Sequence, residues 1–241
     1  MRLVIGSRQF DLATRSLVMG ILNRTPDSFF DRGEFFALDA TMRRAEQLVV
    51  EGADILDVGG VKAGPGPEVS EPEELERVIP AVAAVRARFD VPISVDTWRA
   101  EVARAAYAAG AEVGHDISGF AVPDYLRVSA AAGATVVATH IRREPRVPDP
   151  EPHYVDVVAT VCEFLADRAR RAELAGIPSE RIVVDAGLDL GKTWEQSLEL
   201  LRRSDALAAL GVARGCRIVR AHDVRGTRRV CDTIAAVLEA A

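Results

Sequence analysis

Cysteines, aromatic residues and long apolar runs are scarce in this sequence, and the scarcity excludes several classes of protein. Only three cysteines occur among 241 residues, and Cys162, Cys216 and Cys231 have no short paired spacing, so neither a disulfide framework nor a zinc site is indicated. No apolar run approaches the roughly 18 residues that a membrane-spanning helix needs. The N-terminus lacks the basic, apolar and small-residue regions of a signal peptide, which predicts a cytoplasmic protein.

The chain also lacks an excess of positive charge. Its formal net charge of −6 at pH 7 disfavours a general role on nucleic acid or on a membrane surface, so an anionic substrate would need a local cluster of donors. Hydrophobic residues make up 49% and charged residues 27%, a balance that favours a large core over disorder. The length suits a single domain over residues 1–241, built as a β/α barrel, although two smaller domains also fit.

Short apolar runs alternate with longer amphipathic stretches along the chain. Strands are predicted at 17–22, 54–58, 92–95, 112–116, 135–140, 181–185 and 217–221. Helices are predicted at 39–52, 71–89, 99–109, 122–132, 154–175, 194–210 and 224–239. Because each strand precedes a helix, the pattern predicts an α/β fold with parallel strands and right-handed crossovers.

Polar and glycine-rich segments follow several of the predicted strands, as at 23–31, 59–66 and 186–193. In a β/α barrel these loops line the C-terminal face, where catalytic residues collect. In an open doubly wound sheet they would lie at the ligand crevice, so the local pattern leaves both architectures open.

The segment 23–29, Asn-Arg-Thr-Pro-Asp-Ser-Phe, follows the first of these strands and by itself fits an ordinary turn as well as a site. Further motifs occur in order: Gly-Gly at 59–60, Ser-Val-Asp-Thr at 94–97, Asp-Ile-Ser-Gly at 116–119, 185–193, and Arg-Ala-His-Asp at 220–223. Together they resemble dihydropteroate synthase from about residue 17 to the end. The resemblance implies a (β/α)8 TIM barrel, a homodimer, and a reaction that joins 6-hydroxymethyl-7,8-dihydropterin diphosphate to p-aminobenzoate with release of diphosphate.

The resemblance also implies roles for particular side chains. Asp96 and Asp185 match the carboxylates that accept hydrogen bonds from the pterin ring, although each also fits a helix cap or an ion pair. Asn23 matches the amide associated with diphosphate and magnesium. Arg220 and His222 match the pair that contacts the pterin and the diphosphate, and their spacing of two places both on one face of a strand.

Several positions depart from the family pattern. In the second loop Gly64 stands where the family has an arginine that serves the anionic substrates, and Ala63 stands where it has a threonine. Lys62 offers a replacement cation for the diphosphate, although lysine lacks the planar fork that grips phosphate at two points. His115 replaces a pterin-binding asparagine and offers a different geometry of donor and acceptor.

Changes also occur in the first and sixth loops. Leu190 replaces an aromatic residue beside the arylamine pocket, and Asp189 places a carboxylate where the family has glycine. Arg24 replaces a small apolar residue, which predicts extra positive charge near the diphosphate.

The largest departure is the seventh βα unit, because only seven strands are predicted and nothing matches the family's Ser-Arg-Lys-Ser segment. Either the unit is deleted, or the sequence as given omits it near residues 210–212. A barrel that lacks a strand closes poorly and exposes strand edges, which favours an omitted unit.

These changes predict a divergent paralogue, a pterin-site protein of the folate-pathway family with weak or no synthase activity. An active dihydropteroate synthase re-equipped by Lys62, His115 and Arg24 is the alternative. A pterin-dependent methyltransferase is a third interpretation, which the segment 23–29 and the Arg220–His222 pair disfavour.

Overall fold

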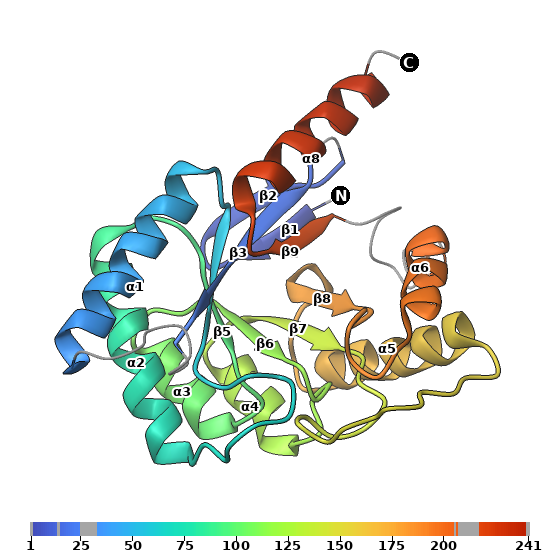
Figure 1. Cartoon of the computed structure of the whole chain (residues 1–241), viewed down its shortest axis with the longest axis horizontal. Helices are drawn as coiled ribbons and strands as arrows, with labels where there is room; N and C mark the ends of the chain where they lie inside the picture. Colours follow the sequence, from blue (N-terminus) through green and yellow to red (C-terminus); the bar gives the residue numbers. More distant parts are fainter. Residues whose placement is uncertain (1, 14, 25–32, 205, 207–216, 240–241) are drawn as a thin grey trace.

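Seven parallel strands form one curled sheet in the computed structural model, and helices surround its outer face (Figure 1). The structure describes residues 2–13, 15–24, 33–204, 206 and 217–239, without the side chains of 33–37 and 237–239. The sheet order is β8-β7-β6-β5-β4-β3-β9, and the strands are β3 (Leu17–Asn23), β4 (Ile55–Gly59), β5 (Ile93–Asp96), β6 (Val113–Asp116), β7 (Thr135–Thr139), β8 (Ile182–Asp185) and β9 (Ile218–Ala221). All seven predicted strands are therefore present, and the fold is of the (β/α)8 type.

The helices also lie close to the predicted ranges. They are α1 (Gly33–Val50), α2 (Glu71–Arg88), α3 (Ala100–Ala108), α4 (Pro123–Ala131), α5 (Val157–Leu174), α6 (Trp194–Arg202) and α8 (Val224–Glu239), with a 3₁₀ turn, η2, at Ser179–Arg181. Helix α6 begins at a capping box in which Thr193 and Gln196 exchange side-chain and backbone hydrogen bonds. Most of the predicted range beyond Arg202 lies outside the described residues. In the described part of the chain, no helix combines the length and apolarity needed to cross a membrane.

An N-terminal hairpin, which the sequence pattern did not predict, packs against the base of the sheet. Strands β1 (Arg2–Ile5) and β2 (Arg8–Asp11) pair antiparallel. Leu3 and Ile5 of the hairpin join a buried cluster with Met19 and Ile55 of the sheet. The hairpin therefore covers the end of the curled sheet opposite the C-terminal ends of its strands.

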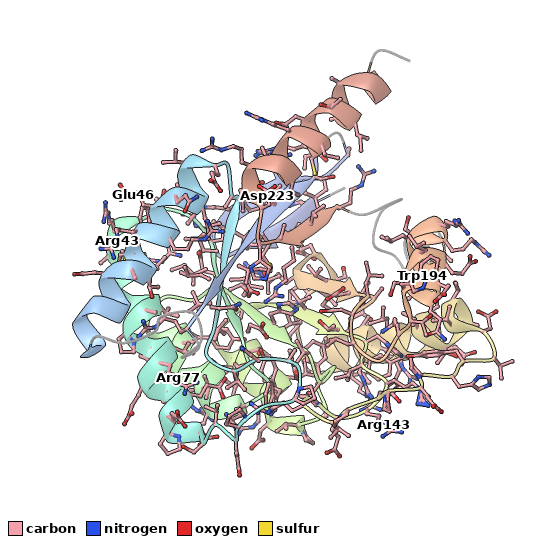
Figure 2. All side chains as sticks on the ribbon, in the orientation of Figure 1. Arg43, Glu46, Arg77, Arg143, Trp194 and Asp223 are labelled. Carbon is pink, nitrogen blue, oxygen red and sulfur yellow. The ribbon has the colours of Figure 1, made fainter. Side chains whose placement is uncertain are left out.

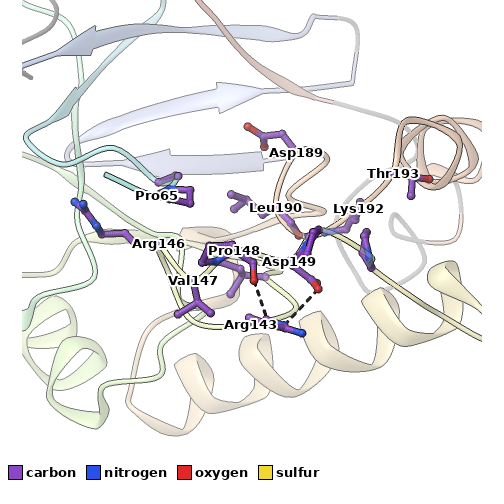
Figure 3. A pocket seen from close by; sticks show the side chains of 16 residues that line it. Pro65, Arg143, Arg146, Val147, Pro148, Asp149, Asp189, Leu190, Lys192 and Thr193 are labelled. Atoms are coloured by element: carbon purple, nitrogen blue, oxygen red, sulfur yellow. Dashed lines mark hydrogen bonds and ion pairs between the residues drawn. The ribbon is translucent and has the colours of Figure 1, made fainter. Parts of the chain in front are cut away.

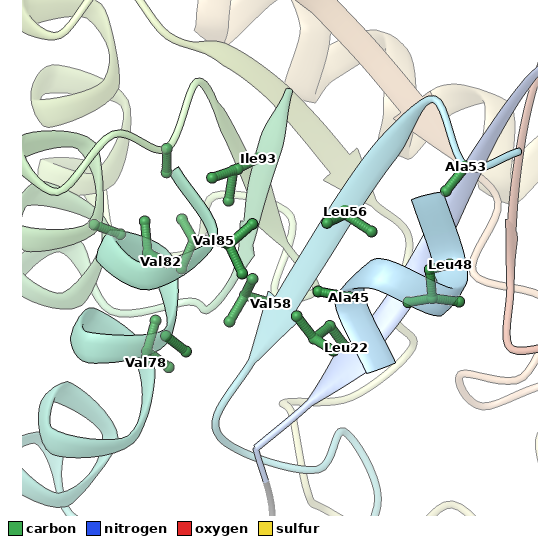
Figure 4. Close-up of a cluster of buried hydrophobic side chains, with 14 of the residues drawn as sticks. Leu22, Ala45, Leu48, Ala53, Leu56, Val58, Val78, Val82, Val85 and Ile93 are labelled. Carbon is green, nitrogen blue, oxygen red and sulfur yellow. The ribbon is translucent and has the colours of Figure 1, made fainter. Parts of the chain in front are cut away.

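Two further apolar clusters lie between the sheet and the helices. Leu22, Leu48, Leu56, Val82 and Ile93 belong to the first, which joins β3–β5 to α1 and α2 (Figure 4). The second cluster joins β7 and β8 to α4 and α5. Because successive side chains of a strand point to opposite faces, the outward positions supply these clusters and the inward positions remain for the site.

The curled sheet is open between β8 and β9. Among the described residues, β8 pairs only with β7 and β9 pairs only with β3. Helices α6 and α8 lie on either side of this opening (Figure 1), and both carry exposed apolar side chains, including Leu201 (50% exposed) and Val230 (58% exposed). A β/α barrel that lacks one βα unit would have two such unpaired strand edges beside apolar helix faces.

Candidate functional site

The inward face of the sheet carries a layer of polar side chains near the C-terminal ends of the strands. On β4, Ile55 belongs to the buried cluster at the base, and Asp57 lies two residues further along on the same face. The parallel register places Asp96 of β5 opposite His115 of β6. Arg220 occupies an inward position on β9. Residues that are far apart in the sequence therefore meet inside the curled sheet.

Arg220 joins two aspartates across the interior. Its Nε lies 2.6 Å from Asp57 Oδ2, and one terminal nitrogen lies 2.7 Å from Asp96 Oδ2. Asp57 is fully buried, and it is one of two residues of this network that no sequence motif indicated. The sequence does carry a sign of it, because a single aspartate stands inside the apolar run Ile-Leu-Asp-Val. A carboxylate is rarely buried in such a strand unless it has a charged partner.

His115 connects the two halves of the site. Its Nδ1 lies 3.3 Å from Asp57 Oδ2, and its Nε2 lies 3.1 Å from the hydroxyl of Thr139. That hydroxyl donates to Asp185 Oδ2 at 3.2 Å, so it accepts from His115. The ionised Asp57 can only accept. With the hydroxyl assigned in this way, both ring nitrogens take the donor role, which is the arrangement of a protonated imidazole.

The electrostatics of the network agree with this assignment. Burial opposes charge on His115 and is the largest single influence, but the carboxylates of Asp57 and Asp96 together outweigh it and raise the pKa of the imidazole. Burial likewise opposes ionisation of Asp57, but Arg220 and His115 lower its pKa below the usual range. Burial raises the pKa of Asp96, and the attraction of Arg220 offsets this only in part.

The structure brings together Asp96, His115, Asp185 and Arg220, the four residues predicted to bind the pterin. Their common setting also includes two residues that no motif indicated, Asp57 and Thr139. The carboxylate of Asp185 is held by the amide of Gly187 (2.9 Å) as well as by Thr139.

The residues predicted to contact the diphosphate lie on the loops around this network. Asn23 ends β3 and is half-buried, and Lys62 in the second loop is exposed. His222, just beyond β9, is also exposed, and its carbonyl accepts a hydrogen bond from Arg44 (2.7 Å). The rest of the first-loop motif, 25–29, lies outside the described residues.

Arg24 is directed toward the helices. Its Nε donates to the carbonyl of Arg77 (3.2 Å), and one terminal nitrogen donates to the hydroxyl of Thr41 (3.1 Å). Figure 2 shows Arg77 on α2, on the outer side of the sheet. The guanidinium of Arg24 is therefore held by contacts with α1 and α2. The sequence had predicted that this residue adds positive charge beside the diphosphate.

The sixth loop is anchored by a half-buried lysine. Lys192 Nζ lies 2.9 Å from His140 Nδ1 and donates to the carbonyls of Gly187 (2.7 Å) and Leu190 (3.1 Å). Burial lowers the pKa of Lys192 to about 8, and burial together with Lys192 lowers that of His140 to about 4. Gly187 has φ +58°, and a Cβ there would lie 2.2 Å from the carbonyl oxygen of His140. This arrangement fixes the loop that begins at Asp185.

A cleft of about 290 Å³ lies where three loops meet. The second loop contributes Pro65, the segment after β7 contributes Arg146 and Val147, and the sixth loop contributes Leu190 and Lys192. In Figure 3, Arg146 lies at one end of the cleft and Lys192 at the other. Lys192, which lines the cleft, is close enough to Asp185 for the carboxylate to act on its charge, so the cleft lies near the polar network.

Two places in the site offer ligand atoms for a metal ion. Ligand atoms of Asp57, Asp96 and His115 lie within 4.8 Å of one another. Arg220 already bonds both carboxylates, however, and a protonated His115 has no lone pair for a metal, so this cluster does not fit one. Asn23 fits better, because its amide oxygen is a hard ligand and its side chain makes no hydrogen bond to another described residue.

The comparisons with known proteins agree with this geometry. Residues 19–224 match the family described as pterin binding enzyme. A dihydropteroate synthase of Synechocystis is 38% identical, with 95% of this chain and 92% of that protein covered. The inactive dihydropteroate synthase 2 of Mycobacterium leprae is 37% identical over 93% of this chain and 91% of its own length.

A solved structure gives the same result at the level of the fold. The dihydropteroate synthase of Xanthomonas albilineans with 4-aminobenzoic acid superposes with a TM-score of 0.89 at 35% identity, covering 98% of each chain. The barrel and its inward carboxylates define a pterin-binding enzyme fold. Within that class, the chain belongs to the dihydropteroate synthase family of the folate pathway.

The comparison also bears on the missing unit. The alignment with the Synechocystis protein runs over 267 positions, whereas 95% of this 241-residue chain is about 229 residues. About 38 aligned positions therefore have no residue of this chain opposite them. One βα unit of a barrel has about 30 residues, so the shortfall has the size of one unit.

Proposed function

We propose that this chain binds a pterin diphosphate weakly at the Asp96–Asp185 network and forms little or no dihydropteroate. The synthase reaction breaks the bond between the pterin methylene carbon and the diphosphate oxygen, while the arylamine nitrogen bonds to that carbon and loses a proton. The reaction needs no protein nucleophile, so the chain would act by holding the pterin and by stabilising charge on the departing diphosphate. Each of these two tasks is compromised in this chain.

The observation that carries the proposal is the state of His115. Both of its nitrogens have partners within the protein, Asp57 and Thr139, so a pterin must displace one of them to bond the ring. Arg220 similarly holds the carboxylate of Asp96. A ligand must break these charged contacts before it can pair with Asp96.

The second loop supports the same conclusion. At Gly64, where the family has arginine, a Cβ would meet no atom within 4 Å, so the position itself is open and carries no side chain that could contact an anion. A hydrogen bond to a charged group contributes about 1.5–3 kcal/mol, so one lost contact lowers affinity or rate roughly tenfold to a hundredfold. The Mycobacterium leprae relative, which bears the name inactive dihydropteroate synthase 2, fits this interpretation.

Magnesium and a second subunit complete the proposal. The amide oxygen of Asn23 would hold magnesium, together with oxygens of the diphosphate, and the ion would neutralise charge on the leaving group. Lys62 and Arg220 would supply the protein's own positive charge there, and His222 an imidazole N–H donor. The homodimer that the resemblance implies is checked by light scattering on the purified chain.

An active synthase is the second candidate, because Asp96, Asp185 and Arg220 already lie together in one network. Two measurements separate the candidates. Calorimetry with the pterin diphosphate and magnesium should give a dissociation constant weaker than about 100 μM, roughly two lost charged contacts above a micromolar site. Product analysis by chromatography should show turnover below about a hundredth of that of an active family member assayed beside it. Normal turnover would overturn the proposal in favour of the active synthase.

A further inference from the structure

Arg146 ties the segment after β7 to the second loop. Its backbone amide donates to the carbonyl of Ala63 (3.0 Å), and its guanidinium donates to the carbonyl of Pro67. The same guanidinium lies 3.5 Å from where a Cβ of Gly66 would be. One residue therefore contacts the second loop at both ends of the stretch 63–67.

The backbone of Arg146 has an unusual conformation. Its φ of +70° lies in the left-handed region, which is unfavourable for a residue with a Cβ. Such a conformation persists when surrounding contacts determine it, and these conformations collect at functional sites. The two bonds to the second loop supply such contacts.

The other anchors of the second loop lie at its ends. Arg77 donates to the carbonyl of Gly60 (3.0 Å), and Arg99 donates to the carbonyl of Val69 (2.7 Å). Between these ends the chain is largely exposed at 64–68. Arg146 therefore holds the part of the loop that neither of these anchors reaches.

We propose that Arg146 is a positioning residue that fixes the second loop and so forms one wall of the cleft beside Asp185. The inference rests on the proposed function in one respect, because it assigns the cleft to the second, arylamine substrate and leaves the pterin to the polar network. Arg146 acts through Ala63 and Pro65, which line the cleft from the second loop.

The guanidinium of Arg146 differs from that of the nearby Arg143 in the kind of partner it has. Arg143 bonds the carboxylate of Asp149 at 3.3 Å. For Arg146, no described carboxylate lies within the 4.0 Å of an ion pair, and its acceptor is a neutral carbonyl. Its placement therefore follows from the second loop and not from an ion pair within its own segment.

Hydrogen exchange measured by mass spectrometry on the full chain tests the contact directly. Arg146→Gln should raise the exchange rate of the segment 61–69 by about tenfold, because the loop opens locally once the guanidinium is gone. Arg146→Lys keeps a donor on a similar stem and should recover most of the protection. The matched control is Arg127→Gln, which removes the same charge from the exposed surface of α4. It should leave the segment within about twofold of the unmodified chain.

Ligand binding separates a positioning role from a merely structural one. Arg146→Gln should weaken p-aminobenzoate about threefold to tenfold in calorimetry, leave the affinity for the pterin diphosphate unchanged, and leave the thermal midpoint within about 2 °C. Unchanged exchange, or faster exchange with unchanged p-aminobenzoate affinity, would overturn the inference. If the unmodified chain binds neither ligand, the proposed function fails, and exchange in 61–69 alone decides whether Arg146 holds the loop.

Discussion

The sharpest test of the interior network is Arg220→Met. Methionine retains a flexible apolar stem but removes the cation that bridges Asp57 and Asp96. The two carboxylates would then face each other with only His115 as a nearby positive charge. We expect the variant to fold but to unfold at a lower denaturant concentration.

The magnitude follows from the burial of the three side chains. Asp57 is 0% exposed, Asp96 13% and Arg220 34%. Removing one partner of a buried pair costs about 3–5 kcal/mol, and the partial exposure of Arg220 screens its contribution toward the lower end of that range. Asp57 also keeps His115 at 3.3 Å. The free energy of unfolding at pH 7 should therefore fall by about 3 kcal/mol.

The sign of the pH dependence is also determined. The folded pKa of Asp57 lies below its unfolded value of 3.8, so its contribution is present above about pH 4 and is lost as the pH falls further. The difference between the unmodified chain and Arg220→Met should therefore shrink in acid.

The assay is urea denaturation followed by circular dichroism, arranged as a double-mutant cycle with Asp57→Asn. In the double variant the buried carboxylate is gone, so removal of Arg220 should cost less than about 1 kcal/mol. Arg127→Gln on the surface of α4 serves as the charge-matched control. A loss below 1 kcal/mol in Arg220→Met, or no coupling in the cycle, would refute the account of the network.

Three further predictions concern His115, Gly64 and Lys192. His115→Asn should lower stability to urea more at pH 5.5 than at pH 8.5, because the raised pKa stabilises the fold fully below about 6.5 and this contribution is lost as the pH rises through the folded pKa. Gly64→Arg has open space around its Cβ and should tighten pterin diphosphate binding about tenfold in calorimetry, since it returns a charged donor to the second loop. Lys192→Met should raise the pKa of His140 above about 4 in an NMR titration, although burial, the larger cause, should keep it below 6.5.

Each of these predictions has a contrary result. An equal loss of stability at both pH values would show that His115 is not protonated in the folded chain. For Gly64→Arg, Gly64→Gln is the control for side-chain bulk, and equal affinities of the two variants would dismiss the role of charge. A pKa for His140 that stays at about 4 in Lys192→Met would mean that burial alone sets it.

Much of the fold could be predicted from the sequence, because the strands and helices that build it carry local signals. The buried strands are short apolar runs, and α6 begins at a Thr-x-x-Gln capping box that is visible in the sequence. The hairpin of β1 and β2 was missed, because β2, Arg-Gln-Phe-Asp, has little apolar character. It forms because β1 packs under the sheet, and that contact involves residues more than a hundred positions away, as when Thr135 donates to the carbonyl of Val4.

The candidate site likewise has a part that the sequence indicated and a part that only the structure revealed. Sequence motifs alone indicated Asp96, His115, Asp185 and Arg220 as candidates, since each stands near a strand end in a recognisable setting. Only the tertiary structure showed that Asp57 joins them, that both nitrogens of His115 have oxygen partners, and that Arg24 turns to the helices. Partners and protonation depend on which side chains the curled sheet brings within about 3 Å, and that proximity depends on strand register and not on neighbouring residues in the chain.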